Sequence, residues 1–561
     1  MRPIDDQLSQ LLRRIIQQDA LLPEPGAAET PSSLYRWDLP KDPGFGDLAN
    51  AVAFKIAAGK KQPPQAIAET LSRRLLAQCR EDGLAPWVDR IEAKGGFLNV
   101  FLSQHALASI LRDIIARGDR YGARRTASPP SVNIEFVSAN PTGPLSVAHG
   151  RQAAVGDVLA RLLRSQGSRV ITEYYLNDEG RQIEMLGRSL RARYLETLNR
   201  PEPFPEDGYH GVYVIDSAQR CVKQYGDTLA EKPLDDFMRV GMEEQLQDIK
   251  RVLAQFGLQF DQWTSQRWLR SSGKIDVALE ALRAKEALYD AEDATWFAST
   301  KFGDDKDRVV RKRDGELTYL APDIAYHQWK FQQGYDTLIN LWGPDHHGYI
   351  ARVKAAMKAL GFPEERLLIR IVQLVTLSRH GKPVPMSKRQ GEFVTFEEVL
   401  NEVGVDATRF FFLMRTMESH LDFDLDLAKS QSQENPVYYI QYAHARICSI
   451  LAKCQMPWWR RLRPDLRLLR APEERRLMSW LFQYPVVLRI CAMAYEPHGL
   501  SVYLRKLAES FHVFYTKHRV IGDDPRVSAA RLVLVQATRQ ALANGLGILG
   551  ISAPSHMDKH Q

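Results

Sequence analysis

The stretch VNIEFVSANPTGPLSVAHG, residues 132–150, runs from a strand-like segment through turn residues into a helical pattern. Residues 132–137 are rich in Val, Ile and Phe, which is typical of a β-strand, and residues 147–163 have apolar side chains at helical spacing. A helix that begins beyond the carboxyl end of a strand presents unpaired N–H groups and a positive dipole end to phosphate. The stretch therefore predicts a nucleotide-binding α/β fold with His149 in the first helical turn, although Pro and Gly before a helix also form ordinary turns.

Further strand candidates extend this pattern along the chain. They lie at residues 169–174, 337–342 and 367–375, and a helix is expected from about His346. Strands that are separated by helices imply a parallel, doubly wound sheet.

The rest of the chain divides around this sheet. Residues 176–300 are mostly helical and charged, so we expect an insertion there within an α/β domain that spans 126–430. Residues 1–125 combine a helical pattern with a short strand-like segment and predict a small α+β domain. At its end, the run 120–130, which is basic and then rich in Ser and Pro, predicts a linker. After about residue 430 the pattern is almost wholly helical, which predicts a separate all-α bundle over 431–561.

Composition and charge set broad limits on function. The 561 residues include 44% hydrophobic and 25% charged residues, as in an ordinary globular protein, and no apolar run approaches the roughly 18 residues that a membrane span needs. The five cysteines form no CxxC pair, and the N-terminus resembles neither a signal nor a transit peptide. We therefore expect a cytoplasmic, multidomain protein with no membrane attachment or disulfide framework. The net charge of +7 favours a polyanionic partner without requiring one.

A second loop suited to phosphate follows the apolar segment that ends at Val375. The sequence RHGKPVPMSKRQG, residues 379–391, carries several Arg and Lys side chains around two glycines. Three such cations within reach of one nucleotide would neutralise a triphosphate and the charge that develops in the transition state. Taken alone, the loop also fits a solvated basic segment. Two phosphate-suited loops after strands of one predicted sheet favour nucleotide chemistry.

These segments together resemble a known family. The sequence EFVSANPTGPLSVAH, residues 135–149, resembles the HIGH-motif segment of arginyl-tRNA synthetases, and residues 386–389 resemble their KMSKS loop. The resemblance continues, in order, through residues 174–183, 319–327, 343–349 and 438–446. It implies a class I Rossmann-type catalytic domain with a helical insertion, preceded by a tRNA-contacting domain and followed by an α-helical anticodon-binding domain.

The resemblance implies a reaction in two steps. The carboxylate of L-arginine attacks the α-phosphate of ATP and releases pyrophosphate, and the arginyl group then passes to the terminal adenosine of tRNA-Arg with release of AMP. The resemblance also implies Mg²⁺ with the ATP, no tightly bound cofactor, and a cytoplasmic monomer. Such chemistry depends on positioning and charge stabilisation more than on covalent catalysis.

The residues implied to act on ATP lie in the two phosphate-suited loops. By resemblance, His149 and Lys388 act on the triphosphate together with Ser146, and Ser387 supports the loop at 382–391. The implied ATP-binding residues are Gly143, Pro144, Ala148, His149, Gly150, Met386, Ser387 and Lys388.

Selection of arginine requires carboxylates, because a guanidinium group is always charged and carries donors but no acceptor. Glu135 and Asp323 stand in otherwise apolar surroundings, which is unusual for structural positions. The arginine-binding residues implied by the resemblance are Glu135, Ser138, Asn140, Tyr319, Asp323 and His347. Tyr319 and Asp323 are four residues apart and would share one face of a helix, whereas the alternative for Asp323 is a helix N-cap after Pro322.

One cluster, Asp345-His346-His347, suggests a metal ion. Adjacent side chains on a helix or strand point in different directions, and no HExxH spacing follows. We therefore predict no protein-bound metal, and Mg²⁺ held mainly by the phosphate oxygens of ATP.

The start of the C-terminal bundle carries aromatic and basic residues. In the family this bundle binds the anticodon, where unstacked bases lie on aromatic rings and Arg planes. Tyr438, Tyr442 and Arg446 are the implied contacts, although each Tyr also fits the core of a helix pair. In the N-terminal domain, no residue stands out as a tRNA contact.

The chain departs from the family pattern at three positions. Ser146 stands where the signature has His, Ala148 where it has Gly, and Pro385 where the KMSKS pattern has its first Lys. Some family members without this lysine carry a compensating lysine at the position of Gly143. Two alternatives stay open: a noncatalytic tRNA-binding paralogue, and another nucleotidyltransferase on the same fold. The retained arginine-binding residues argue against the first, and the helical bundle argues against the second.

Overall fold

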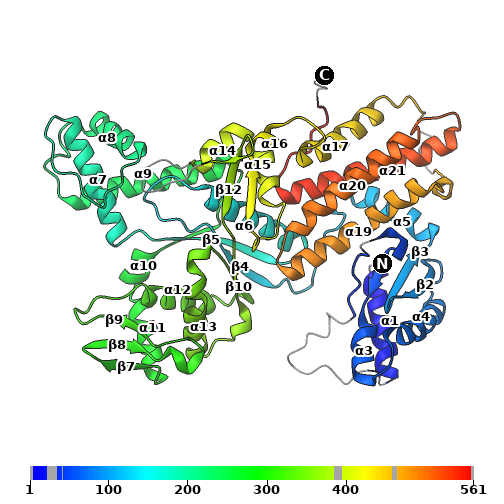
Figure 1. Ribbon diagram of the computed structural model, residues 1–561, viewed down its shortest axis with the longest axis horizontal. Coiled ribbons are helices and arrows are strands. Elements are labelled where there is room, and N and C mark those ends of the chain that lie inside the picture. The colour runs from blue at the N-terminus through cyan, green and yellow to red at the C-terminus, as the bar shows by residue number, and fades with distance from the viewer. Residues whose placement is uncertain are drawn as a thin grey trace.

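The computed structural model describes residues 4–19, 21, 35–40, 42–384, 394–457 and 464–557. The chain forms an N-terminal part, a central α/β part and a group of long C-terminal helices (Figure 1). The C-terminal helices pack against both of the other parts.

The N-terminal part is an α+β unit, as predicted. Its antiparallel sheet has the order β1 (Leu48–Asn50), β3 (Phe97–Leu102), β2 (Val88–Lys94). Helix α4 (Pro64–Glu81) packs against this sheet, and α1 (Ile4–Gln18) packs on α4. The apolar residues whose helical spacing predicted α1 are all buried: Leu8, Leu11, Leu12, Ile15 and Ile16.

The central part is built on a five-stranded parallel sheet, which confirms the predicted fold class. The strand order is β11 (Leu367–Ile371), β10 (Thr337–Trp342), β4 (Ser131–Glu135), β5 (Arg169–Leu176), β6 (Gln262–Ser265). Helix α6 (Val147–Ser165) connects β4 to β5, whereas β10 lies on the other side of β4. The strand order therefore reverses between β4 and β10, and open α/β sheets bind ligands at such a switch point.

The region that we predicted as one helical insertion, residues 176–300, is interrupted by a strand of the main sheet. Before β6, the helices α7 (Arg181–Thr197), α8 (Val212–Tyr225) and α9 (Leu234–Gln255) form a first insertion. Between β6 and β10 lies a second one, which includes α10 (Gln266–Ser271), α11 (Lys274–Ala284), the antiparallel strands β7 (Leu288–Ala291), β8 (Ala294–Phe297) and β9 (Arg308–Arg311), and α12 (Leu320–Gln332). The sequence of β6, QWTS, is too short and polar to be recognised as a strand.

The apolar run 367–375, which we predicted as one strand, divides into two. After β11 the chain leaves the main sheet, and β12 (Val375–Arg379) pairs with β14 (Leu421–Asp424) and β13 (Lys382–Pro383). The buried guanidinium of Arg151 explains part of the break, because it donates to the carbonyl oxygen of Gln373 at 2.9 Å. The helix expected from His346 likewise begins later, as α13 (Ile350–Ala359), after a 3₁₀ segment at Pro344–Tyr349.

The C-terminal part consists of long helices, as predicted. They are α17 (Pro436–Ala452), α19 (Pro472–Ala494), α20 (His498–Lys517) and α21 (Pro525–Leu549). Within the described residues, α19 is the one helix long and apolar enough to cross a membrane, and its apolar residues are mostly buried. Helices α5 (Gln104–Arg117) and α20 pack on it, so its hydropathy is that of a core helix.

Two buried contacts fix the parts relative to one another. Tyr121, in the segment predicted as a linker, stacks on Tyr484 of α19 and donates its hydroxyl to the carbonyl oxygen of Leu481 at 2.9 Å. Arg409 of α15 (Val405–Phe412) donates to Asp157 of α6 at 2.7 Å. Its guanidinium also donates to carbonyl oxygens at the ends of α9 and α21, so one buried cation joins four helices.

Candidate active site

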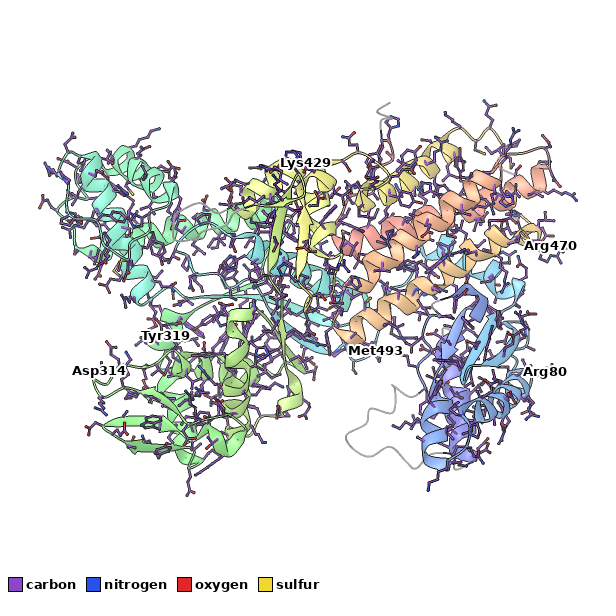
Figure 2. The ribbon with its side chains drawn as sticks, viewed as in Figure 1. Arg80, Asp314, Tyr319, Lys429, Arg470 and Met493 are labelled. Atoms are coloured by element: carbon purple, nitrogen blue, oxygen red, sulfur yellow. The ribbon has the colours of Figure 1, made fainter. Side chains whose placement is uncertain are left out.

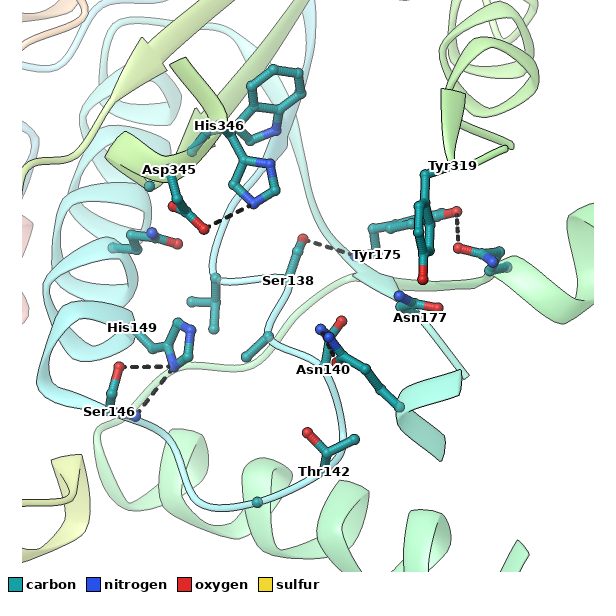
Figure 3. Close-up of a pocket in the computed structure, with 18 of the residues that line it drawn as sticks. Ser138, Asn140, Thr142, Ser146, His149, Tyr175, Asn177, Tyr319, Asp345 and His346 are labelled. Carbon is teal, nitrogen blue, oxygen red and sulfur yellow. Dashed lines mark hydrogen bonds and ion pairs between the residues drawn. The ribbon is translucent and has the colours of Figure 1, made fainter. Parts of the chain in front are cut away.

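A cavity of about 1070 Å³ lies beyond the carboxyl ends of β4 and β10, at the switch point of the sheet. The loop after β4, the first turn of α6, the loop after β10, the start of α12 and part of the first insertion line it. Figure 3 shows Ser146 and His149 on one side and Tyr175 and Tyr319 on the other, with Asn140 and Thr142 on the loop between them. The predicted residues that line this cavity are Glu135, Ser138, Asn140, Gly143, Pro144, Ser146, His149, Tyr319 and Asp323.

The loop after β4 begins with a strained turn. Val137 has φ +69°, an unusual value for a β-branched residue, and the N–H of Ser138 donates to the carbonyl oxygen of Phe136 at 3.0 Å, which closes a γ-turn. The turn is held by Ser138, whose Oγ accepts from the N–H of Tyr175 at 3.1 Å and donates to Glu135 at 3.2 Å. Backbone strain of about 1–3 kcal/mol persists where surrounding contacts impose it, which is common at functional sites.

Glu135 is a buried carboxylate with a buried cation beside it. Its Oε2 accepts from the Nζ of Lys330 at 3.0 Å, and the Lys330 side chain is fully buried. Burial alone would raise the pKa of Glu135, but the charge of Lys330 and the hydrogen bond from its Nζ outweigh burial and hold the pKa below its ordinary value. The carboxylate therefore stays ionised.

Sequence reasoning missed Lys330, although a signal was present. Asp323, His327 and Lys330 follow one another at helical spacing, so they lie on one face of α12. The helical spacing that relates Tyr319 to Asp323 also relates Asp323 to His327 and Lys330. Lys330 and His327 both contact Asn340 of β10, which joins this polar face to the main sheet.

His327 is neutral and orients Asn340. The Nδ2 of Asn340 donates to its Nε2 at 2.6 Å, so the ring proton is on Nδ1 and faces the carbonyl oxygen of Asp323 at 2.7 Å. Burial and the charge of Lys330 lower the pKa of His327 to about 4. The imidazole thus supplies no positive charge to the carboxylate of Asp323 at neutral pH.

Asp323 is poised to accept a cation. It lies in the first turn of α12, where Tyr319 is the N-cap residue, so the N-cap alternative for Asp323 does not apply. Burial, with a further contribution from the negative charge of Glu135, raises the pKa of Asp323 to about 8. Tyr319, which is labelled in Figure 2, is one of the residues that line the cavity, and its side chain is 68% exposed. A cationic ligand between the two carboxylates would relieve their repulsion.

The other end of the cavity is the N-terminus of α6. Ser146 is the N-cap residue, and its N–H donates to the Nδ1 of His149 at 3.2 Å, with its Oγ 3.1 Å from the same nitrogen. Because Nδ1 accepts, the proton of the neutral ring is on Nε2, which can donate to a ligand. Ser146, which replaces the first His of the motif, therefore orients the second His.

Three predicted residues occupy other places. Ala148 and Gly150 do not line the cavity, and a Cβ at Gly150 would lie 2.4 Å from the ring of Phe396, so close helix packing explains this glycine. His347 is not among the residues that line the cavity, whereas its neighbour His346 is, and both histidines are exposed. The 3₁₀ turn at Pro344–Tyr349 rotates the two adjacent histidines apart.

The structure describes the basic loop, residues 379–391, only as far as residue 384. Met386, Ser387 and Lys388, as well as Pro385 and Arg389, lie outside the described residues. Their roles stay predictions.

A second candidate surface lies on α17 and α20. The rings of Tyr438 and Tyr442 stack with centroids 6.2 Å apart, and Tyr442 stacks on His512 at 6.0 Å. The guanidinium of Arg446 lies over the ring of Tyr515 at 4.9 Å and donates to its hydroxyl. The three predicted residues are half-buried and four positions apart, so they form one face of α17 with aromatic planes and a cation.

A parallel sheet with a HIGH-like helix at its switch point, joined to a helical bundle with this face, defines a class I aminoacyl-tRNA synthetase. Residues 110–417 match the family described as "tRNA synthetases class I (R), catalytic domain". Residues 4–102 match the "Arginyl tRNA synthetase N terminal domain", and residues 440–557 match the "DALR anticodon binding domain". The chain belongs to the arginyl-tRNA synthetase family.

Individual relatives agree with this assignment. The chain is 44% identical to the arginine–tRNA ligase of Carboxydothermus hydrogenoformans over 532 residues, which covers 93% of this chain and 94% of the relative. It is 43% identical to that of Thioalkalivibrio sulfidiphilus, covering 98% and 100%. The solved structure of Thermus thermophilus arginyl-tRNA synthetase superimposes with a TM-score of 0.74 at 23% identity, covers 99% of this chain and 100% of its own, and shows the common fold.

Proposed function

We propose that this arginine–tRNA ligase binds arginine and ATP next to each other in the cavity at the switch point of the sheet. The observation that carries the proposal is the polarity of that cavity. Two carboxylates, Glu135 and Asp323, stand at one end, and the N-terminus of α6 with His149 stands at the other. One end suits a doubly cationic amino acid and the other suits a polyphosphate.

At the arginine end, Asp323 accepts the guanidinium group. An ionised carboxylate can bind this planar fork of donors through two parallel hydrogen bonds, and Tyr319 covers the side chain. Glu135 and Asn140 hold the α-amino end, with Ser138 as the support of Glu135. Lys330 donates to Glu135 and balances part of its negative charge. The buried carboxylate of Glu135 is therefore paired even when no arginine is bound.

At the ATP end, His149 donates from Nε2 to the triphosphate, and the N–H groups of the first turn of α6 add their dipole. Gly143 and Pro144 line the same region, and Lys388 supplies a charge from the basic loop. The arginine carboxylate then attacks the α-phosphorus, the bond to the bridging oxygen of pyrophosphate breaks, and the leaving charge is stabilised by these donors. Mg²⁺ would be held mainly by the phosphate oxygens, because the described residues offer no cluster of three or more His, Cys, Asp or Glu side chains suited to a metal ion.

In the second step, tRNA-Arg must contact the protein from the C-terminal helices to the cavity. The face of α17 with Tyr438, Tyr442 and Arg446 suits unstacked anticodon bases. In the N-terminal part, Phe54 and Phe97 form an exposed edge-to-face pair with centroids 5.0 Å apart, which offers a further surface for a tRNA base. We further propose that the protein works as a monomer in the cytoplasm.

Arginine-dependent exchange of pyrophosphate into ATP tests the proposal, with and without tRNA-Arg. Wild type is expected to show exchange, and Asp323→Asn is expected to lose it at arginine concentrations that saturate wild type. Asp293→Asn is the matched control, because Asp293 is an exposed residue in the β7–β8 turn and Asn tolerates its φ of +60°. Unchanged exchange in Asp323→Asn would refute the assigned arginine site. Absence of exchange by wild type under both conditions would refute the proposed binding of arginine and ATP in this cavity.

A further inference from the structure

A tyrosine of the first insertion contacts the loop that precedes α6. Tyr213 lies in the first turn of α8, and its hydroxyl donates to the carbonyl oxygen of Thr142 at 2.8 Å. Thr142 is 71 residues away in the chain and lies between the γ-turn and the N-terminus of α6. The insertion therefore holds the backbone of the loop that faces the ATP end of the cavity.

The next residue is shaped to receive this ring. A Cβ at Gly143 would lie 2.9 Å from the hydroxyl oxygen of Tyr213 and 3.0 Å from its Cζ, closer than side chains pack. Any larger side chain at this position would therefore have to displace the Tyr213 ring or the loop.

The contact is part of a continuous wall of the cavity. Tyr209, His210, Gly211 and Tyr213 line it together with the loop after β4. These four residues are bound to the rest of the insertion by a hydrogen bond, in which the N–H of Tyr209 donates to the Oγ of Ser189 in α7 at 2.9 Å. Burial raises the pKa of Tyr213, so its hydroxyl remains a hydrogen-bond donor throughout the physiological pH range.

We propose that Tyr213 is a positioning residue for ATP, which acts by fixing the backbone at Thr142 and Gly143 against the wall of the first insertion. The inference rests on the proposed function, in which ATP binds at this loop. Tyr213 acts through Thr142 and Gly143, so its effect is expected in ATP binding and not in the affinity for arginine.

The first test is Tyr213→Phe, which removes the hydrogen bond and keeps the ring. In arginine-dependent pyrophosphate exchange with tRNA-Arg present, we expect the KM for ATP to rise about three- to tenfold, as for one neutral hydrogen bond. The KM for arginine and the kcat should change less than twofold. Tyr194→Phe is the matched control, because it removes a hydroxyl that donates to the carbonyl oxygen of Gly226 at 2.7 Å inside the same insertion. An equal rise of the ATP KM in the control would overturn the inference, since the effect would then come from the stability of the insertion.

The second test is a double-mutant cycle between Gly143 and Tyr213. Gly143→Ala is expected to raise the KM for ATP in the wild-type background, because the new methyl group meets the Tyr213 ring. The rise should be smaller in a Tyr213→Ala background, where the space is open. Equal rises in both backgrounds would show that the two positions act independently and would overturn the inference.

The outcomes separate this inference from the proposed function. If wild type catalyses no exchange, the proposed function fails. If wild type is active and Tyr213→Phe has a normal KM for ATP, only the role of Tyr213 fails. Should Tyr213→Ala not fold, as judged by its circular dichroism, Tyr213→Phe and Gly143→Ala still decide the question, because each changes only a few atoms.

Discussion

The affinity for arginine should depend steeply on pH, because the carboxyl group that receives the guanidinium is largely protonated in the empty site. Burial and the charge of Glu135 raise the pKa of Asp323 to about 8. The guanidinium binds the ionised form, so arginine competes with a proton. Raising the pH towards 8 weakens that competition, and the affinity for arginine increases.

The size of the effect follows from the fraction of Asp323 that is ionised. With a pKa of about 8, that fraction is roughly 1% at pH 6, 9% at pH 7 and 50% at pH 8. The Kd for arginine should therefore fall about ninefold from pH 6 to 7 and about fivefold from pH 7 to 8. Binding at pH 7 should release about 0.9 proton per site. Glu135 and His327 do not titrate in this range, because the pKa of Glu135 is lowered and that of His327 is about 4.

Isothermal titration calorimetry of arginine without ATP measures both quantities. Titrations in two buffers of different ionisation enthalpy give the number of protons released, and a series from pH 6 to 8 gives the Kd. Asp293→Asn is the matched control and should keep the wild-type pH dependence, whereas Asp323→Asn should bind arginine weakly at every pH. A Kd that stays constant from pH 6 to 8 without proton release in wild type would show that Asp323 is already ionised in the empty site, and the reasoning would be wrong.

Three further predictions concern other parts of the molecule. Lys388→Ala should lower the rate of pyrophosphate exchange at least tenfold, because Pro385 leaves the loop with fewer charges, and a near-normal rate would contradict the role of Lys388. Lys330→Met should lower the free energy of unfolding by about 3–5 kcal/mol in urea titrations, because it leaves the buried Glu135 carboxylate without its cation. A loss below about 1 kcal/mol would instead mean that this carboxylate becomes protonated or hydrated. Tyr442→Ala should raise the KM for tRNA-Arg about 5- to 100-fold in aminoacylation, which corresponds to the loss of one stacked base, and should leave the KM for ATP unchanged. A KM for tRNA-Arg equal to that of wild type would mean that Tyr442 serves in the helix core instead.

Local patterns were sufficient to predict much of the fold. The strand at Thr337–Trp342 and the helix that begins at Val147 have the predicted bounds or nearly so, because their hydrophobic periods are long and their turn residues are clear. The order of strand, turn and helix at 132–150 also placed His149 in the first turn of a helix. These features depend on neighbours in the chain, and such neighbours are visible in a sequence.

Contacts between distant segments could not be predicted in this way. The strand β6 exists because it pairs with β5, and the run 367–375 breaks where Arg151 takes the carbonyl oxygen of Gln373. His346 lines the cavity in place of His347 because of the rotation of one 3₁₀ turn.

The chemistry of the site also combines features that follow from the sequence with features that depend on folding. The residue types and their order were enough to predict a carboxylate pocket for arginine and a helix N-terminus for ATP, because the charge of a side chain and its spacing from its neighbours can be read from the sequence. The raised pKa of Asp323, the buried Lys330 beside Glu135 and the ring of Tyr213 against Gly143 depend on folding. Burial and electrostatic coupling arise between segments 70 to 200 residues apart, and they exist only once the sheet has brought these segments to one edge.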